Sequence, residues 1–259
     1  MINFLINAIK IIFLLGFLIL IHEGGHCIVA KLCKVKVNEF AIGFGKVIWQ
    51  KQGKETRYSI RLIPLGGFCS MEGETEESEE KGSFSKASVW KRMAIVVSGA
   101  VVNILFGILV YFILVSTVGI QFVDPARDTF FNRIYYGAKG TGEFIVTIFD
   151  SIKTLITGGI QADQMVGIVG ISEVVVQTNG IINYLHLLAV ISVSLGVTNL
   201  LPIPALDGGK ILILLIEVIR RKPMKLETEA KIQLLGFSIL MALTIFVTYN
   251  DILRIGAGS

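Results

Sequence analysis

The chain contains four apolar stretches that are long enough to cross a lipid bilayer, and they restrict its fold more than any other feature. They cover about residues 4–29, 93–120, 181–219 and 232–248. A spanning helix needs about 20 mostly apolar residues. Pro202 and Pro204 interrupt the third stretch at 202–207, because proline cannot continue a helix. We therefore expect an α-helical multi-pass membrane protein of about four transmembrane helices with a broken third span.

The composition supports a membrane protein and argues against one that binds nucleic acid. Hydrophobic residues make up 53% of the 259 positions and charged residues 17%, compared with about 25% charged residues in soluble domains. The net charge of +4 is modest and is better explained by basic loops that face a cytoplasm. Cys27, Cys33 and Cys69 lack C-x-x-C spacing, so neither a disulfide framework nor a zinc knuckle is expected.

The basic residues are concentrated in two of the three loops between these stretches. Lysine and arginine occupy 12 positions in residues 30–92 and 5 in residues 220–231, but 4 in residues 121–180. Cytoplasmic loops of membrane proteins are enriched in these residues. We therefore expect a protein of the inner (plasma) membrane, with the first and third loops in the cytoplasm and both termini outside.

A polar motif, His22-Glu23-Gly24-Gly25-His26, directly follows the uncharged run 11–21. Residues four apart lie on one face of a helix, so His22 and His26 point the same way, with Glu23 beside them. This is the layout of two zinc ligands and a general base in metalloproteases. Polar and charged groups are costly within a membrane and indicate a functional site. The predicted orientation places this site toward the cytoplasmic side.

A catalytic zinc ion needs a third protein ligand besides the two histidines. Soluble metzincins place a further histidine where this chain has Leu32. Asp207 follows the break of the third span at about the depth of the first motif, and broken helices in membranes line cavities or are buried in protein. On its own Asp207 also fits a helix N-cap, but the need for a ligand at this depth favours coordination. Other, less well placed candidates are Asp163, Glu173, His186 and Glu217.

The first loop contains a predicted β-hairpin at about residues 35–70. Residues 57–62 alternate polar and apolar side chains, which indicates a strand, and glycines mark the base of the hairpin. The acidic run 72–80 that follows is typical of a solvated segment. In the second loop, apolar residues recur at helical spacing over 144–157. This pattern predicts a helix that either lies on the outer membrane surface or packs into a core.

The chain resembles the site-2 protease family of intramembrane zinc metalloproteases, and more closely its bacterial regulatory branch. The resemblance rests on HEGGH in a first span and on N-x-x-P-x-P-x-L-D-G in a later one, from Asn199 to Gly208. Further matching motifs follow in the family's order: Gly43-Phe44-Gly45, Tyr58 to Phe68, Trp90-Lys91-Arg92 and Asn103. Together the matching segments cover most of the chain.

This resemblance implies an intramembrane zinc endopeptidase that cleaves transmembrane segments of single-span membrane proteins, such as anti-sigma factors or remnant signal peptides. It implies one catalytic Zn²⁺ with His22, His26 and Asp207 as ligands. Glu23 would be the general base, and Asn199 would help to hold the substrate or the oxyanion. The hairpin would bind an unwound substrate by strand addition. The substrate-binding residues predicted beside Asn199 are Tyr58, Ile60, Leu62, Gly66 and Gly67.

The chain departs from the family pattern after its second span. The bacterial branch usually carries a PDZ domain there, whereas residues 121–137 are too few for one. We therefore expect a single intramembrane metalloprotease domain over residues 1–259, whose partners are transmembrane substrates and the lipid bilayer. Two alternatives are a non-proteolytic scaffold of the same fold and a zinc transporter, which would more naturally have metal-binding residues along several spans.

Overall fold

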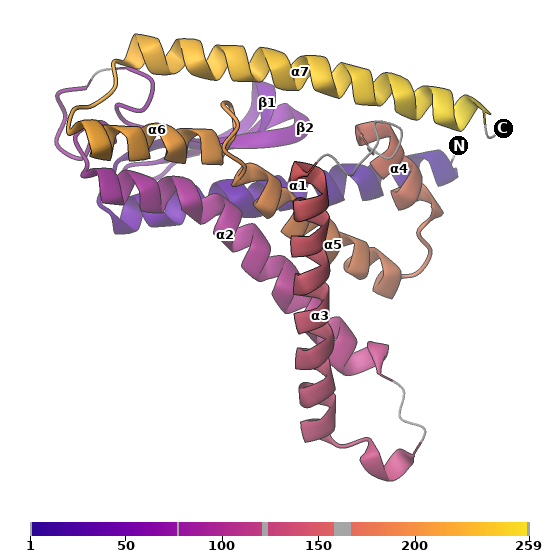
Figure 1. Cartoon of the computed structure of the whole chain (residues 1–259). Helices are drawn as coiled ribbons and strands as arrows, with labels where there is room; N and C mark the ends of the chain where they lie inside the picture. The colour runs from indigo at the N-terminus through magenta and orange to yellow at the C-terminus, as the bar shows by residue number, and fades with distance from the viewer. Residues whose placement is uncertain (1, 77, 121–123, 158–166, 258–259) are drawn as a thin grey trace. The chain divides into compact units, whose positions relative to one another are not determined.

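Long apolar helices dominate the structure, as the hydropathy of the chain predicts (Figure 1). The computed structural model describes residues 2–76, 78–120, 124–157 and 167–257. Within them, four helical segments are long and apolar enough to cross a membrane: Leu5–Leu32, Val89–Gly119, Ile181–Asn199 and Leu226–Arg254. The prediction of a multi-pass helical membrane protein is therefore confirmed.

The described elements follow one another as helices interrupted by one hairpin. In chain order they are α1 (Ile2–Leu32), β1 (Val37–Gln52), β2 (Arg57–Met71), α2 (Val89–Leu114), a π-helical turn (Val115–Gly119), a 3-10 turn (Pro125–Arg127), α3 (Phe130–Ile156), α4 (Ile168–Gln177), α5 (Ile181–Asn199), α6 (Asp207–Arg220) and α7 (Leu226–Ala257). The chain divides into two compact parts. The first comprises the described residues up to 103 and residues 195–241, and the second comprises the rest.

The predicted break of the third span lies in the first part. Helix α5 ends at Asn199 and α6 begins at Asp207, so Pro202 and Pro204 both fall between the two helices. Ala205 adopts a left-handed conformation with φ of 76°, which is unfavourable for a residue with a Cβ atom. The chain therefore turns sharply just before Asp207, and this turn fixes where α6 begins.

The hairpin of the first loop is confirmed, and its two strands bend so strongly that each forms two segments of one sheet. Tyr58 pairs with both Phe40 and Lys51, so the start of β2 lies between the two halves of β1. The bends contain residues in left-handed conformations, Gly43 with φ of 87° and Gly66 with φ of 126°. Glycine adopts such angles readily because it has no Cβ atom. From one edge to the other, the segments are 47–52, 57–61, 39–42 and 67–71.

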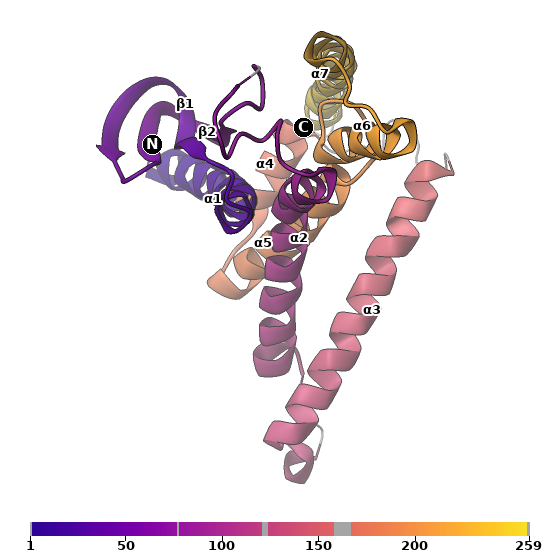
Figure 2. The ribbon, with the colours of Figure 1, turned by 90° about the vertical axis from the view of Figure 1, so that its left-hand side faces the viewer.

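The sheet lies beside α1 (Figure 2). The buried core of this part includes Ala30 of α1, Val37 of β1, Cys69 of β2 and Ile95 of α2. Leu214 of α6 belongs to the same cluster. Five elements therefore share one core, which positions α6 against α1.

One buried carboxylate, Glu39, organises the polar face of the sheet. It accepts hydrogen bonds from the Ser59 hydroxyl at 2.6 Å and from the Arg61 guanidinium at 2.7 Å, and it pairs with Arg57. Burial by itself would raise the pKa of Glu39, but these hydrogen bonds and the Arg57 charge outweigh it and lower the pKa to about 2. The ionised carboxylate therefore stabilises the folded hairpin.

The second part contains the remaining loop helices. The helix predicted over 144–157 is part of α3, which begins earlier, at Phe130. Asp251 of α7 is buried and accepts hydrogen bonds from the backbone N–H groups of Gly167 and Gly170, at 3.0 and 2.8 Å. A carboxylate at this position satisfies N–H groups that have no partner within α4 itself. Asp251 thereby holds the start of α4 against α7.

We expect acid to destabilise the hairpin through Glu39. The fold lowers the pKa of Glu39 from its ordinary value of 4.5 to about 2. The stabilisation by the ionised carboxylate is therefore complete above about pH 4.5 and is lost as the pH falls toward 2. Fluorescence of Trp49 in β1 should report this loss in a Trp90→Phe background. Glu39→Gln should unfold the hairpin already at neutral pH or abolish the acid transition. An unchanged transition in this variant would contradict the assignment to Glu39.

Candidate metal centre

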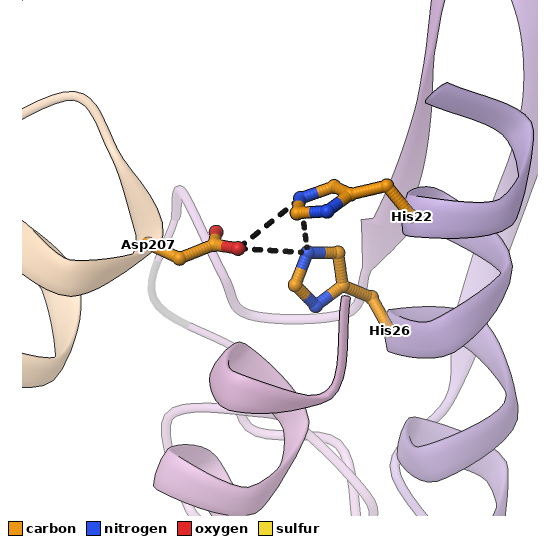
Figure 3. Close-up of side chains that lie close together, drawn as sticks. All are labelled: His22, His26 and Asp207. Atoms are coloured by element: carbon orange, nitrogen blue, oxygen red, sulfur yellow. Dashed lines mark hydrogen bonds and ion pairs between the residues drawn. The ribbon is translucent and has the colours of Figure 1, made fainter. Parts of the chain in front are cut away.

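Two histidines of α1 and one aspartate of α6 converge on a common point, as Figure 3 shows. The Nε2 atoms of His22 and His26 lie 3.1 and 3.4 Å from Oδ2 of Asp207. The two Nε2 atoms are 3.2 Å apart. His22 and His26 are buried, and the side chain of Asp207 is 19% exposed. The three residues selected from the sequence are therefore brought together by the fold.

This arrangement fits a tetrahedral metal ion. Ligand atoms about 2.0–2.1 Å from a zinc ion in tetrahedral geometry lie about 3.3 Å from one another. The three observed separations, 3.1, 3.2 and 3.4 Å, agree with that value. Two imidazole nitrogens and one carboxylate oxygen also form a donor set that suits zinc. Three protein ligands would leave one position of the tetrahedron open.

The hydrogen bonding of His26 prepares it for coordination. Its Nδ1 atom lies 2.8 Å from the carbonyl oxygen of Ile95, so Nδ1–H donates to that oxygen. The lone pair of neutral imidazole is then on Nε2, which points at Asp207. A histidine that coordinates a metal ion commonly has its other ring nitrogen held by a hydrogen bond of this kind. His22 has no such support among the described residues, because its buried Nδ1 has no hydrogen-bond partner there.

Asp207 is the first residue of α6, and its carboxylate does not cap the helix. The N-cap position is Leu206, and the alternative reading of Asp207 as an N-cap is therefore not what the structure shows. A Cβ atom at Gly208 would overlap the carbonyl oxygen of Leu201, so only glycine permits the preceding loop to fold back this closely. The Ala205 N–H also donates to the Gln233 side chain of α7. Loop and helix together fix Asp207 opposite the histidines.

Helices α1 and α2 approach each other closely at the motif glycines. A Cβ atom at Gly25 would lie 2.7 Å from the Ser98 carbonyl oxygen and 3.0 Å from Cα of Gly99. A Cβ atom at Gly99 would overlap Nε2 of His26 and lie 2.9 Å from Cε1 of His22. At Gly24, by contrast, a Cβ atom would meet nothing within 4 Å. Of the two motif glycines, Gly25 therefore permits the close approach of α2, whereas Gly24 faces open space.

Glu23 stands between the three ligands and the edge of the sheet. The Cys69 N–H of β2 donates a hydrogen bond of 3.0 Å to Oε2 of Glu23. The Glu23 carboxylate also interacts electrostatically with His22, His26 and Asp207. A Cβ atom at Gly67 would lie 3.7 Å from Cγ of Glu23, so this strand passes directly beside the carboxylate. One carboxylate oxygen is thus held by the backbone, which orients the other.

The other candidate ligands have different environments. Glu217 is buried and pairs with Arg92 of α2 at 2.6 Å, which explains a carboxylate at this depth without a metal. His186 packs against the ring of Tyr111, with ring centroids 5.4 Å apart. Glu173 accepts a hydrogen bond from Gln177 on α4, and Asp163 lies outside the described residues. Asn199 ends α5 and makes no hydrogen bond to the three ligands in the part of the chain that is described.

A cavity with both charged and apolar lining residues lies beside Asp207. It has a volume of about 340 Å³, and its lining includes Asp207, Glu74, Lys210 and Glu229. Lys210 and Glu74 form an ion pair of 2.6 Å across it. Glu74, Lys210 and Glu229 also line a second cavity of about 700 Å³, which opens between α6, the start of α7 and the loop after β2. Of the three ligands, Asp207 therefore borders a cavity to which charged side chains contribute.

Sequence reasoning missed the residues that support the ligands from other elements. Gly99, the Ile95 carbonyl and the Cys69 N–H all lie against the motif, and all three do so with backbone atoms. Backbone contacts leave no signature in residue type. Gly99 alone offered a signal, because a glycine inside an apolar helix is unfavourable unless something packs against it.

The chain is similar to known membrane peptidases over most of its length. The model of peptidase family M50 matches residues 10–243. A predicted zinc metalloprotease of Clostridium acetobutylicum is 30% identical over 95% of this chain and 97% of its own length. The zinc metalloprotease RasP of Bacillus licheniformis is 26% identical over 96% of this chain and 99% of its own. The two alignments extend over 329 and 418 positions, so both relatives contain segments without a counterpart here.

Gly99→Ala should weaken metal binding, because its methyl group would displace the Nε2 atom of His26. Disturbing the support of a metal ligand typically lowers affinity about 10- to 100-fold. Competition between the purified protein and a chelator for Zn²⁺ measures the change. Gly24→Ala is the matched control: it should leave the affinity within about twofold and stabilise α1 by up to about 1 kcal/mol. Equal Zn²⁺ affinity of the two variants would contradict the close contact at Gly99.

Proposed function

The chain belongs to peptidase family M50, and on this premise we propose that it is an intramembrane zinc endopeptidase that cleaves transmembrane segments of single-span membrane proteins. The observation that carries the proposal is the convergence of His22, His26 and Asp207 beside the carboxylate of Glu23. Three of these four residues, His22, Glu23 and His26, lie in a helix that is long and apolar enough to cross a membrane. Metal ligands, base and apolar surroundings are those required for peptide hydrolysis within a bilayer.

His22, His26 and Asp207 would hold the zinc ion. When bound, it would acidify a water molecule and polarise the peptide carbonyl that is attacked. Glu23 is placed to accept the proton of the attacking water and to return it to the amide nitrogen that leaves. The Cys69 N–H holds one oxygen of Glu23, so the other oxygen performs this transfer in a fixed orientation. The cavity beside Asp207 supplies water from the side of the loops.

The edge of the sheet next to Glu23 suits the binding of an extended substrate. In an antiparallel strand, alternate residues direct both backbone groups to the same side. Cys69 directs its N–H away from β1 and toward Glu23, so Gly67, two residues earlier, directs its backbone groups to that side too. A substrate segment added along this edge would pass beside the base. A helical substrate would have to unwind first, because helical hydrogen bonds occupy its backbone groups.

The residues proposed for substrate binding then have different roles. Tyr58 and Ile60 belong to the inner segment of the sheet, and both are paired on two sides. Their side chains could contact a substrate, but their backbone cannot add a strand. Gly67 lies on the edge itself, Gly66 forms the bend before it, and Leu62 lies at the start of that bend. Asn199 directly precedes the loop to Asp207, where its amide could hold a substrate carbonyl.

We further propose that the protein lies in the inner membrane with the metal centre toward the cytoplasm. The support is the excess of lysine and arginine in the loops 30–92 and 220–231. Anti-sigma factors and remnant signal peptides are substrates of the expected kind, since each presents a single span.

A scaffold and a zinc transporter are the alternative functions. A scaffold has no need of a general base, whereas this chain has Glu23 beside the ligands, and a backbone hydrogen bond orients its carboxylate. A transporter needs successive binding positions across the membrane. Among the described residues, His22, His26 and Asp207 form the one cluster of this kind.

Glu23→Gln should abolish proteolysis and leave zinc binding intact. Removing a general base lowers rates by about 10²- to 10⁴-fold. Cleavage of a tagged single-span substrate in liposomes gives the rate, and elemental analysis gives bound zinc. His26→Ala, as a comparison, should lose both activity and zinc. Undiminished cleavage by a zinc-loaded Glu23→Gln protein would refute the mechanism, and absence of cleavage by the wild type would favour the scaffold.

Backbone N-methylation of a synthetic apolar substrate should reveal the strand addition. Each methyl group removes one N–H donor, and losing one such hydrogen bond costs about 1 kcal/mol, or about fivefold in rate. Because alternate residues of a strand face the partner, sensitive and insensitive positions should alternate along the substrate. The helicity of each methylated peptide, measured by circular dichroism, shows whether the methyl group acts by changing how easily the substrate unwinds. A uniform effect at all positions would argue against binding along Gly67 and Cys69.

A further inference from the structure

A basic cavity lies at the end of α1, beside the turn of the hairpin. Its volume is about 690 Å³, and three separate segments line it: the end of α1 with the residues that follow, the hairpin turn 53–56, and the loop at 81–82. Five lysines contribute to its lining, against the single carboxylate of Glu55: Lys31, Lys34, Lys36, Lys54 and Lys81. None of the interactions that form the metal centre involves these lysines.

The positive charge of this cavity is only partly neutralised within the protein. Lys36 pairs with Glu80 at 2.6 Å. For Lys34, Lys54 and Lys81, no carboxylate lies within ion-pair distance in the part of the chain that the structure describes. Three ammonium groups from three different segments thus border one space, and its single lining carboxylate, Glu55, forms no ion pair with any of them. Repulsion between them is relieved when an anion binds.

Tyr58 supplies a neutral donor in the same cavity. Its hydroxyl oxygen accepts a hydrogen bond of 2.8 Å from Nζ of Lys31. The proton of the hydroxyl therefore points elsewhere and is available for an acceptor in the cavity. A phosphate group, with several acceptor oxygens, would match a hydroxyl donor surrounded by ammonium groups.

The surface next to the cavity is apolar and belongs to a membrane-spanning helix. Ile28 lies one turn before Lys31 and is 61% exposed, and Leu32 is 75% exposed. Residues three apart share a helix face, so Ile28 continues the face of Lys31 into the membrane. A soluble anion would use only the lysines, whereas a lipid would use both the lysines and the apolar surface beneath them.

We propose that this cavity binds the phosphate headgroup of an anionic phospholipid, with the acyl chains along Ile28 and Leu32. Basic pockets at the ends of transmembrane helices bind such headgroups. The bound headgroup would join the end of α1 to the hairpin turn, because Lys31, Lys54 and Tyr58 come from these two elements. The site does not depend on the proposed proteolytic activity and can be tested in the Glu23→Gln protein.

Native mass spectrometry of the full chain in a neutral detergent tests the proposal. The probes are phosphatidylglycerol, phosphatidylcholine and inorganic phosphate, each titrated separately. The variant Lys34→Gln/Lys54→Gln/Lys81→Gln removes the three unpaired charges. Its matched control, Lys46→Gln/Lys51→Gln/Lys222→Gln, removes three exposed charges that do not line the cavity. A third variant with arginine at positions 34, 54 and 81 keeps the charge.

We expect saturable binding of phosphatidylglycerol that weakens at least about tenfold in the cavity variant. Binding should change less than about twofold in the control and be retained in the arginine variant, which also shows that the site folds. Equal weakening in the cavity and control variants would refute a specific site. Binding of phosphatidylcholine as tight as that of phosphatidylglycerol would also refute a specific site for an anionic headgroup. Binding of inorganic phosphate as tight as that of the lipid would refute a lipid headgroup as the ligand.

Discussion

The burial of two imidazoles and a carboxylate among apolar helices is the constraint on which the first part of the structure depends. Such groups are costly to remove from water unless they compensate one another. His22 and His26 can meet Asp207 only if α6 begins at the right depth beside α1. The break after α5 provides that start, since a continuous third helix would leave no free N-terminal turn to carry a carboxylate.

The close approach of α1 and α2 follows from the same requirement. The Ile95 carbonyl can accept from His26 only where the two backbones nearly touch, and side chains at Gly25 or Gly99 would separate them. Each glycine weakens its helix by about 1 kcal/mol. Leaving the buried Ile95 carbonyl and the buried Nδ1–H of His26 without partners costs about 1–3 kcal/mol for each group. The two glycines therefore cost less than the loss of this contact between α1 and α2. The ion pair of Arg92 with Glu217 also connects α2 to α6.

The sequence contained most of the chemistry of the site but little of its support. Periodicity and hydropathy predicted the spans, and two short motifs identified His22, Glu23, His26 and Asp207, because metal ligands and helix breaks depend on residue type. The folding of β1 and β2 back on themselves was not predictable. Alternation identifies a strand but not its neighbours, so it does not reveal that Tyr58 lies in an inner segment and is paired on two sides. The prediction began this helix at residue 144, whereas α3 starts at Phe130, where Phe130, Ile134 and Ala138 already recur at helical spacing.

The sheet contacts α1 through polar atoms at two places, and this pair of contacts determines how its edge can act. Cys69 binds Glu23, and Tyr58 binds Lys31, eight residues further along α1, or about 12 Å along the helix axis. A single contact would allow the sheet to rotate about it, whereas two contacts fix both its position and its direction. Glu39 and its partners stiffen the sheet between them. The edge at Gly67 is therefore held beside Glu23, and any ligand that strengthens the contact at Lys31 also restrains this edge.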